Sequence, residues 1–159
     1  MAKMLIVYYS RSGNTEKMAQ AVKEGAADVE GVEVELKKVA DTTPDDLLEA
    51  DGIIIGSPTY YGTMASEVKK LIDSSVKYHG KLNGNVGGAF ASSGVMGGGL
   101  ETTVMDILKC MLVHGMIIQG NSQGAHYGPV SVGAPSLDVT KACRAYGQSV
   151  AELTLKLCG

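Results

Sequence analysis

The sequence lacks any apolar run long enough to span a membrane, and its first residues do not show the charged-then-apolar pattern of a signal peptide. We therefore expect a cytoplasmic protein that does not enter a membrane. Cysteine is scarce: Cys110, Cys143 and Cys158 are widely spaced and odd in number, which suits reduced thiols and offers no zinc-ligand spacing. We expect no metal site, and we expect Cys110 and Cys143 to be buried in helices.

Positive charge is not concentrated anywhere in the chain. The sequence has 14 Lys and Arg against 17 Asp and Glu, a net charge of −3, and no basic cluster of the kind that nucleic-acid-binding proteins carry. The hydrophobic content of 45% and the charged content of 19% are those of an ordinary globular protein. Because no repeat or linker divides the 159 residues, we expect a single domain over residues 1–159.

Two common phosphate-binding motifs are also absent. A P-loop requires Gly-x-x-x-x-Gly-Lys-Ser/Thr, but the one Gly-Lys pair, Gly80-Lys81, continues into Leu82. The dinucleotide fingerprint Gly-x-Gly-x-x-Gly does not follow the first apolar run, and no acidic cluster follows it either. These absences argue against a nucleotide triphosphatase, a pyrophosphate-binding turn and a metal-binding receiver domain.

The turn after that first run nevertheless has the residues of an anion site. Met4–Tyr9 is continuously apolar and aromatic, which predicts a strand buried on both faces, and it leads into Ser10–Thr15, which reads S-R-S-G-N-T, and then into a helix. Backbone N–H groups at a helix N-terminus, with hydroxyl and amide side chains beside them, bind phosphate groups. We expect a phosphate monoester held mainly by neutral donors, with Arg11 either adding charge or pointing into solvent.

Strand and helix patterns alternate along the whole chain. The predicted strands are Met4–Tyr9, Val32–Leu36, Ile53–Ser57, Val86–Ala91 and Met116–Gln119. The predicted helices are Thr15–Val29, Thr43–Leu48, a segment around Met64–Ile72, a segment around Val104–Leu112, and Leu137–Leu157. This alternation predicts an α/β fold, a doubly wound five-stranded parallel sheet with helices on both faces. The apolar–charged alternation of Val32–Leu36 is typical of an edge strand and favours the order 2-1-3-4-5.

Two further predictions concern the second half of the chain. Gly120–Pro135 shows no periodicity and is rich in glycine, so we expect one long loop there, and long loops are often functional. The last helix is predicted to turn one face toward the core. The residues on that predicted face are Ala142, Ala145, Ser149, Val150 and Leu153.

In the order 2-1-3-4-5 the ligand crevice lies at the carboxyl ends of the first and third strands. Three segments fall there: Ser10–Thr15, Ser57–Gly62 and Ser92–Gly99. The tyrosines of Ser57–Gly62 either stack on a flat ring or pack on the following helix. Ser92–Gly99 either lets the backbone approach a ligand closely or is a flexible connection. A phosphate at one end and a ring at the other describe a mononucleotide, and a flavin is the one whose chemistry profits from an open ring face.

Four stretches carry a resemblance to known proteins. Ile6–Ala19 resembles the FMN-phosphate signature of flavodoxin-like proteins, while Gly56–Asp73, Gly97–Thr103 and His114–Met116 resemble the Trp-repressor-binding-protein-like (WrbA-type) NAD(P)H:quinone oxidoreductases. The resemblance implies FMN, NADH or NADPH as electron donor, a quinone-like acceptor, and a homo-oligomer, a dimer or a tetramer whose subunits jointly build the site. The cofactor contacts predicted from these patterns and this resemblance are Ser10, Arg11, Ser12, Gly13, Asn14, Thr15, Pro58, Thr59, Tyr60, Tyr61, Gly62, Ser92, Ser93, Gly94, Gly98 and His114.

The chain departs from the family in two segments. Val39–Asp51 is short where members of the family usually carry an insertion, and Ser74–Gly84 is shorter and has no tryptophan; the chain contains none. Both regions help to assemble and cover the site in the family, so the resemblance leaves the substrate and the oligomeric state open.

Two functions of different classes remain, an FMN-dependent NAD(P)H oxidoreductase and a flavodoxin-type electron carrier without its own substrate. Carriers use strong charge to steer toward their partners, and a net charge of −3 is small for that role. The loop Gly94–Gly99 offers no aromatic residue to cover a flavin, which favours the enzyme. A flavin-binding module without turnover is also compatible. His114 is either a structural residue or a contact of the flavin, and no other catalytic residue is predicted because water can supply the protons.

Overall fold

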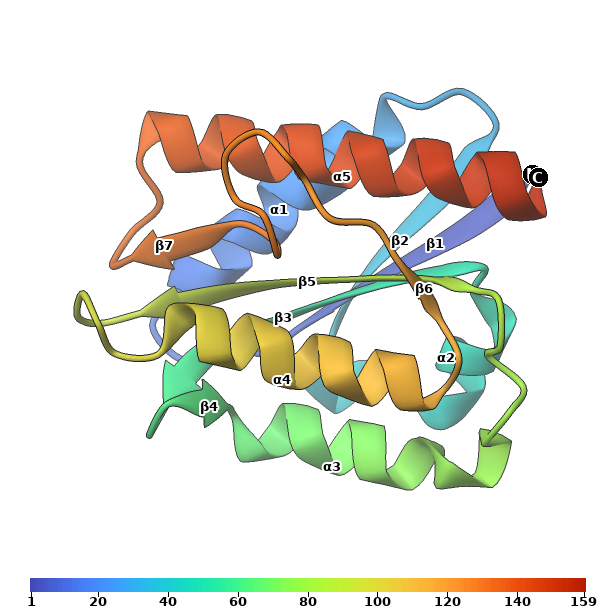
Figure 1. Ribbon diagram of the computed structural model, residues 1–159, viewed down its shortest axis with the longest axis horizontal. Helices are drawn as coiled ribbons and strands as arrows, with labels where there is room; N and C mark the ends of the chain where they lie inside the picture. The colour runs from blue at the N-terminus through green and yellow to red at the C-terminus, as the bar shows by residue number, and fades with distance from the viewer.

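The computed structural model describes residues 1–159 and centres on a parallel sheet whose core order is β2-β1-β3-β5-β6. This order is the predicted 2-1-3-4-5, because the short β4 is inserted in the numbering, and β2 lies at the predicted edge. The five strands are β1 (Ala2–Tyr8), β2 (Val32–Lys38), β3 (Gly52–Tyr60), β5 (Val86–Ser93) and β6 (Ile117–Ile118). The predicted flavodoxin-like fold class is confirmed (Figure 1).

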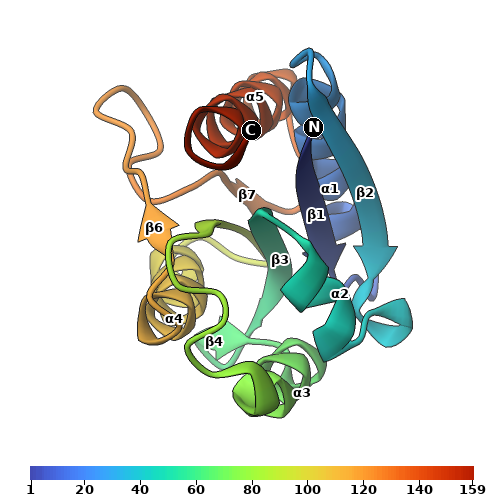
Figure 2. The same ribbon diagram turned by 90° about the vertical axis from the view of Figure 1, so that its right-hand side faces the viewer.

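The helices cover both faces of the sheet, as parallel crossovers require. One face carries α1 and α5, and the other carries α3 and α4, with α2 beside α3 (Figure 2). Their bounds are α1 (Asn14–Ala27), α2 (Pro44–Glu49), α3 (Ser66–Ser74), α4 (Leu100–Val113) and α5 (Leu137–Cys158), with short 3₁₀ turns η1 (Val39–Asp41) and η2 (Ser75–Tyr78). None of these helices combines the length and the apolar character that crossing a membrane requires.

The alternation of side chains along β1 divides the core into two parts. Leu5 and Val7 belong to a cluster of 20 buried residues beneath α3 and α4, whereas Met4 and Ile6 belong to a cluster of 14 residues beneath α1 and α5. Where a strand contributes to two cores it must be apolar on both faces, and this explains why β1 is continuously apolar from Met4 onward, after the exposed Lys3. Each fully buried side chain of this kind contributes roughly 1.5–3 kcal/mol.

Two short strands were not predicted. β4 (Thr63–Met64) pairs antiparallel with the end of β3, so Pro58, Thr59 and Tyr60, predicted as part of a loop, belong to a strand. β7 (Val130–Val132) pairs in parallel with Ala91–Ser93 of β5 and interrupts the predicted loop Gly120–Pro135. β5 itself extends two residues beyond the prediction, to Ser93, because β3 and β7 pair with it on either side.

The face of α5 that is buried is not the one that the sequence predicted. Ala142, Ala145 and Ser149 are exposed, Leu153 is half-buried, and only Val150 of the predicted set is buried. The residues that α5 buries are Cys143, Gly147, Val150, Ala151 and Thr154. A Cβ at Gly147 would lie 2.0 Å from the carbonyl oxygen of Val22, so glycine lets α5 approach α1 closely. Small residues occur on all sides of α5, and hydrophobicity alone therefore cannot identify its buried face.

The three cysteines are free and differ in burial. Cys143 is fully buried, as predicted, and burial raises the pKa of its thiol to about 12. Cys110 is only half-buried, and burial raises its pKa as well. Cys158 lies exposed at the end of α5. Because thiolates are the reactive form, Cys143 is the least reactive of the three on grounds of both access and ionisation.

A gap in the sheet beside β5 is filled by a tyrosine. β6 pairs with Val86 and Gly87, and β7 pairs with Ala91–Ser93, so neither reaches Ala89. The phenolic oxygen of Tyr146 on α5 accepts a hydrogen bond from the Ala89 backbone N–H at 3.0 Å. A Cβ at position 88 would lie 2.6 Å from that oxygen, which explains why glycine occupies the position. The side chain thus replaces the missing strand for one backbone donor.

We predict that Tyr146→Phe lowers the free energy of unfolding by about 1–3 kcal/mol, because the buried Ala89 N–H loses its acceptor. Urea unfolding measures the change. Tyr127→Phe is the matched control, since Tyr127 is exposed and its hydroxyl makes no hydrogen bond within the chain. A Tyr146→Phe protein within about 0.5 kcal/mol of the wild type would show that the hydroxyl is not needed at the gap.

Candidate functional site

The carboxyl ends of β1, β3 and β5 surround a cavity of about 480 Å³. Its ten lining residues come from the three segments that the sequence places at this edge. They are Arg11, Ser12, Asn14, Thr15, Pro58, Thr59, Tyr60, Ser92, Ser93 and Gly94, all of which are predicted site residues. The volume lies in the range of small-molecule sites, and most of the lining residues are of polar types.

The first wall of the cavity is the turn between β1 and α1. Gly13 has a φ of +99°, in the left-handed region, and its N–H donates to the Ser10 hydroxyl at 3.1 Å. No side chain caps α1, α3 or α4, whereas α2 has a capping box and Ser136 caps α5, and of the three uncapped helices α1 contributes residues to the cavity lining. The first N–H groups of α1 are therefore left without acceptors from the chain, at the positive end of the helix dipole. Such a turn provides backbone donors for an anion.

The second wall is tied to the first by a buried hydrogen bond. The Thr15 and Ser92 hydroxyls lie 2.8 Å apart, and both residues are at most 5% exposed. Ser93 is buried beside them, while Arg11 and Ser12 lie exposed at the rim. Each hydroxyl keeps a further lone pair or proton that a ligand in the cavity can use. The charge available to a ligand is thus a single cation at the rim, and the deeper groups are neutral.

The third wall is the hairpin formed by β3 and β4. Tyr61 and Gly62 form its turn, with φ values of +48° and +82°, so a tyrosine occupies a left-handed position that usually takes glycine, asparagine or aspartate. The Tyr61 side chain is fully exposed and does not line the cavity, and neither does Gly62. Tyr60 does line it, and its ring meets Tyr9 edge-on with the ring centroids 6.4 Å apart. Tyr9 was not predicted as a site residue; it directly follows β1.

The beginning of α4 fixes this hairpin. The Thr102 hydroxyl donates to the Gly62 carbonyl at 2.7 Å, and the Thr63 hydroxyl donates to an Asp106 carboxylate oxygen at 2.6 Å. Hydrogen bonds from Lys109 and then from Thr63 lower the pKa of Asp106. Sequence reasoning gave these residues no role, although Gly97–Thr103 stood out as a pattern. Gly98 lies within this segment, outside the cavity lining.

The structure does not bring His114 to the cavity. α4 starts at the cavity edge and its 14 residues carry the chain about 20 Å toward the opposite edge, where His114 follows. There the Ser75 hydroxyl donates its proton to the Ile72 carbonyl. The Ser75 oxygen must therefore accept the 2.8 Å hydrogen bond from His114, so Nε2 of the imidazole carries a proton. His114 Nδ1 is then a buried acceptor without a partner. Within one chain His114 therefore lies too far from this cavity to contact a ligand in it.

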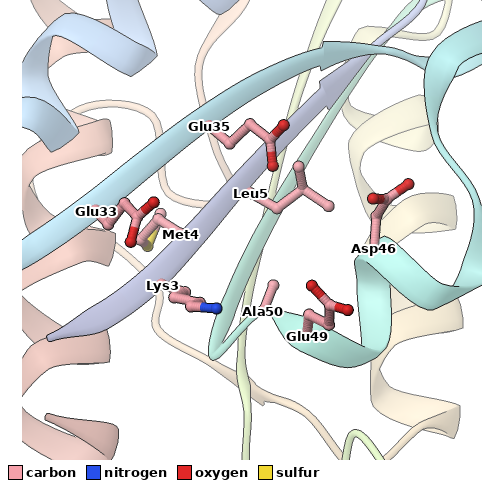
Figure 3. Close-up of a pocket in the computed structure, with 8 residues that line it drawn as sticks. All are labelled: Lys3, Met4, Leu5, Glu33, Glu35, Asp46, Glu49 and Ala50. Atoms are coloured by element: carbon pink, nitrogen blue, oxygen red, sulfur yellow. The ribbon is translucent and has the colours of Figure 1, made fainter.

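A second polar cavity, of about 220 Å³, lies beside the middle of β1 and β2. Figure 3 shows Lys3 and the carboxylates of Glu33, Glu35, Asp46 and Glu49 around the cavity. Lys37 pairs with Glu35 and Asp46 at 3.3 and 2.7 Å. The carboxylates still outnumber the ammonium groups, so the cavity repels a phosphate. The anion site indicated by the sequence is therefore the cavity at the carboxyl edge, and the acidic cavity has no part in it.

The residues at the carboxyl edge fit flavin mononucleotide. The uncapped start of α1 and the neighbouring hydroxyls would hold its phosphate, with Arg11 at the rim. Pro58, Tyr60 and the backbone of Ser92–Gly94 would flank its ring system. The donor set is chemically suited to a phosphate monoester because most of it is neutral and preorganised by the turn.

Comparison with known proteins agrees with this site. The family model described as Flavodoxin matches residues 6–105, which is more than half of the chain and includes all three walls of the cavity. The protein belongs to the flavodoxin family, whose members bind a flavin. The predicted resemblance to flavodoxin-like proteins is confirmed.

Individual relatives divide between two names. A protein of Aquifex aeolicus named flavodoxin is 40% identical, over 96% of this chain and 86% of its own. A protein of Archaeoglobus fulgidus named NAD(P)H dehydrogenase (quinone) is 34% identical, over 99% of this chain and 100% of its own. The solved structure of a flavodoxin, WrbA-like protein from Agrobacterium tumefaciens has a TM-score of 0.84 at 28% identity and covers 99% of both chains. The more specific resemblance to WrbA-type proteins is thus confirmed as well.

We predict that the His114 environment makes folding stability pH-dependent. Burial, and secondarily His79, lowers the pKa of His114 below its ordinary value of 6.5. As the pH falls through 6.5 the unfolded chain gains a proton that the folded chain does not, so stability is lost on acidification. Urea unfolding at about pH 8 and about pH 5.5 should show a smaller loss for His114→Gln than for the wild type. Equal losses in the two proteins would contradict the prediction.

Proposed function

We propose that the protein is an FMN-dependent oxidoreductase that transfers two electrons from NADH or NADPH to a quinone or a similar acceptor. The observation that carries the proposal is the open side of the cavity. Tyr60 is the one aromatic residue in its lining, and the facing segment, Ser92–Gly94, presents only hydroxyls and backbone. A flat ring of a substrate can therefore stack on a flavin from that side without displacing a protein side chain. The relatives named NAD(P)H dehydrogenase (quinone) support this choice.

In this proposal the chain binds and orients, and the cofactor provides the redox chemistry. Bound FMN would supply a centre that accepts a hydride from a nicotinamide and gives two electrons to a quinone. Ser10–Thr15 would hold the phosphate, Pro58–Tyr60 would lie along one side of the ring system, and Ser92–Gly94 would lie along the other. The bond between Thr15 and Ser92 would keep the phosphate wall and the ring wall in register.

The chain offers no dedicated acid–base residue at this cavity. Apart from Arg11 and Tyr60, the lining residues are hydroxyl, amide, proline and glycine residues, with no carboxylate or imidazole among them. The protons that accompany quinone reduction would come from water, which the open cavity admits. The role of the protein is then positioning, which by itself supplies large rate effects in bimolecular reactions.

A specific observation favours a second candidate, an electron carrier without its own substrate. The flavodoxin of Aquifex aeolicus is more similar in sequence, at 40%, than the quinone dehydrogenases, at 34% and 33%. The modest net charge of −3 argues against a carrier, because electron carriers depend on strong charge to steer toward their partner proteins. The two functions share the flavin site and differ in whether a nicotinamide reaches it.

We also propose that the protein acts as a homo-oligomer, a dimer or a tetramer. Tyr61, Val95 and Met96 are exposed apolar side chains on the two loops that flank the cavity opening. Exposed apolar groups gathered beside a site are typical of interfaces. A cytoplasmic location stays a prediction from the sequence.

We predict that NADH or NADPH bleaches the visible absorbance of the FMN-loaded protein under anaerobic conditions and that a quinone restores it. Stopped-flow absorbance with each nucleotide in turn measures the rate and identifies the donor. A flavin that stays oxidised with both nucleotides, yet accepts electrons from a reductase protein, would establish the carrier instead.

We predict that Thr15→Val weakens FMN binding about tenfold to a hundredfold, because a hydrogen bond to a charged phosphate contributes about 1.5–3 kcal/mol. Thr140→Val is the matched control: Thr140 lies in the first turn of α5, and its hydroxyl bonds to the Ser136 carbonyl away from the cavity. Fluorescence titration of FMN with each protein gives the dissociation constants. Equal constants for Thr15→Val and the wild type would remove Thr15 from the site.

A further inference from the structure

A third cavity, of about 400 Å³, lies next to the proposed flavin site on the α3 side of the sheet. Its floor consists of the buried residues Val39, Thr42 and Leu71, and Tyr9 forms one of its walls. The cavity lies between the 3₁₀ turn η1 with the start of α2 and the face of α3 that carries Glu67, Lys70 and Ser74. The size is that of a site for a small organic ligand.

One pair of aromatic rings separates this cavity from the flavin site. Tyr9 lines the third cavity, Tyr60 lines the flavin cavity, and the two rings meet edge-on. A ligand confined to the third cavity could not stack on a flavin, as hydride transfer requires. A ligand made of two linked parts could occupy both cavities, with its reacting part on the flavin and its other part beside Tyr9.

The charges around the third cavity suit a nucleotide. Lys70 lines it and has no carboxylate within salt-bridge distance, whereas its neighbour Lys69 is paired with Asp73 at 2.6 Å. The cavity lining also contains the Glu67 carboxylate, and Lys70 is its one cation. An unpaired ammonium group at that place complements a phosphate group of a ligand.

The remaining groups match the chemistry of adenosine. The Tyr9 ring and the side chains of Val39 and Leu71 provide flat and aliphatic surface for a purine. The Glu67 carboxylate, also in the lining, can accept hydrogen bonds from ribose hydroxyls, as acidic residues do at other adenosine sites.

We propose that the cavity beside Tyr9 binds the adenosine half of the nicotinamide dinucleotide donor, with Lys70 on its pyrophosphate. The proposal presupposes the proposed function, since it assigns a site to the electron donor of that reaction. Binding of this non-reacting half positions the nicotinamide and lowers the KM for the donor.

The test compares two donors on the FMN-loaded protein. The first is the dinucleotide that reduces the flavin faster, and the second is 1-benzyl-1,4-dihydronicotinamide, which carries a dihydronicotinamide ring but no phosphate or adenosine. Lys70→Ala and Ser74→Trp, which places a large ring in the cavity, should each raise KM for the dinucleotide about tenfold. Both variants should leave the rate with the benzyl compound unchanged.

Lys69→Ala is the matched control and should leave the kinetics with both donors unchanged. An unchanged KM in Lys70→Ala and Ser74→Trp would overturn the proposal.

Calorimetry with ADP provides a readout that does not depend on turnover. ADP should bind the FMN-loaded wild type and the Lys69→Ala protein, and Ser74→Trp should abolish that binding. If neither donor reduces the flavin, the proposed oxidoreductase function fails, and ADP binding that Ser74→Trp abolishes still supports an adenosine site. If the dinucleotide reduces the flavin but ADP does not bind, the adenosine site fails and the oxidoreductase function stands.

Discussion

The burial of β1 on both faces is the constraint from which the rest of the structure follows. Met4 and Ile6 need helices on one side of the sheet, and Leu5 and Val7 need helices on the other. Right-handed crossovers satisfy both needs only by bringing the turns after β1, β3 and β5 to a single edge. The cavity at that edge is thus a consequence of core packing. The ligand chemistry comes from what the turns carry, above all the uncapped start of α1.

Once the turns meet, hydroxyl groups determine how rigid the site is. The bond between Thr15 and Ser92 joins the turn of β1 to the end of β5, and the bond from Thr102 joins α4 to the β3–β4 hairpin. Each bond connects segments that are far apart in the sequence, so each restricts one wall relative to another. The hairpin also holds Tyr61 at a φ of +48°, a conformation that costs a non-glycine residue free energy and persists only where neighbouring contacts impose it. The bonds from α4 are such contacts, and the wall that carries Tyr60 is preorganised as a result.

The parts of this structure that could be predicted are those governed by short-range patterns. Continuous apolar runs identified β1 and β3, alternation identified the edge strand β2, and turn chemistry identified the three walls of the cavity. The parts that could not be predicted depend on distant segments: β7 exists because it pairs with Ser92 and its neighbours, and the face of α5 is set by the approach of Gly147 to Val22. The position of His114 is different, because the predicted topology already implies it. In a parallel α/β sheet the crossover helices run antiparallel to the strands, so a residue between α4 and β6 lies at the edge opposite the cavity, and only the family resemblance suggested a contact with the flavin.

The short connection between β2 and β3 bears on how such a site can select its donor. The alignment with the quinone dehydrogenase of Archaeoglobus fulgidus spans 192 residues, more than the 159 of this chain, so that relative carries additional segments. A shorter chain has less surface with which to cover a bound substrate, and it must gain affinity from the surface that remains. A cavity left open beside Tyr9 provides such surface without any added residue. Binding energy from a part of the substrate that does not react can then position the part that does, which is how a small domain can achieve orientation without a lid.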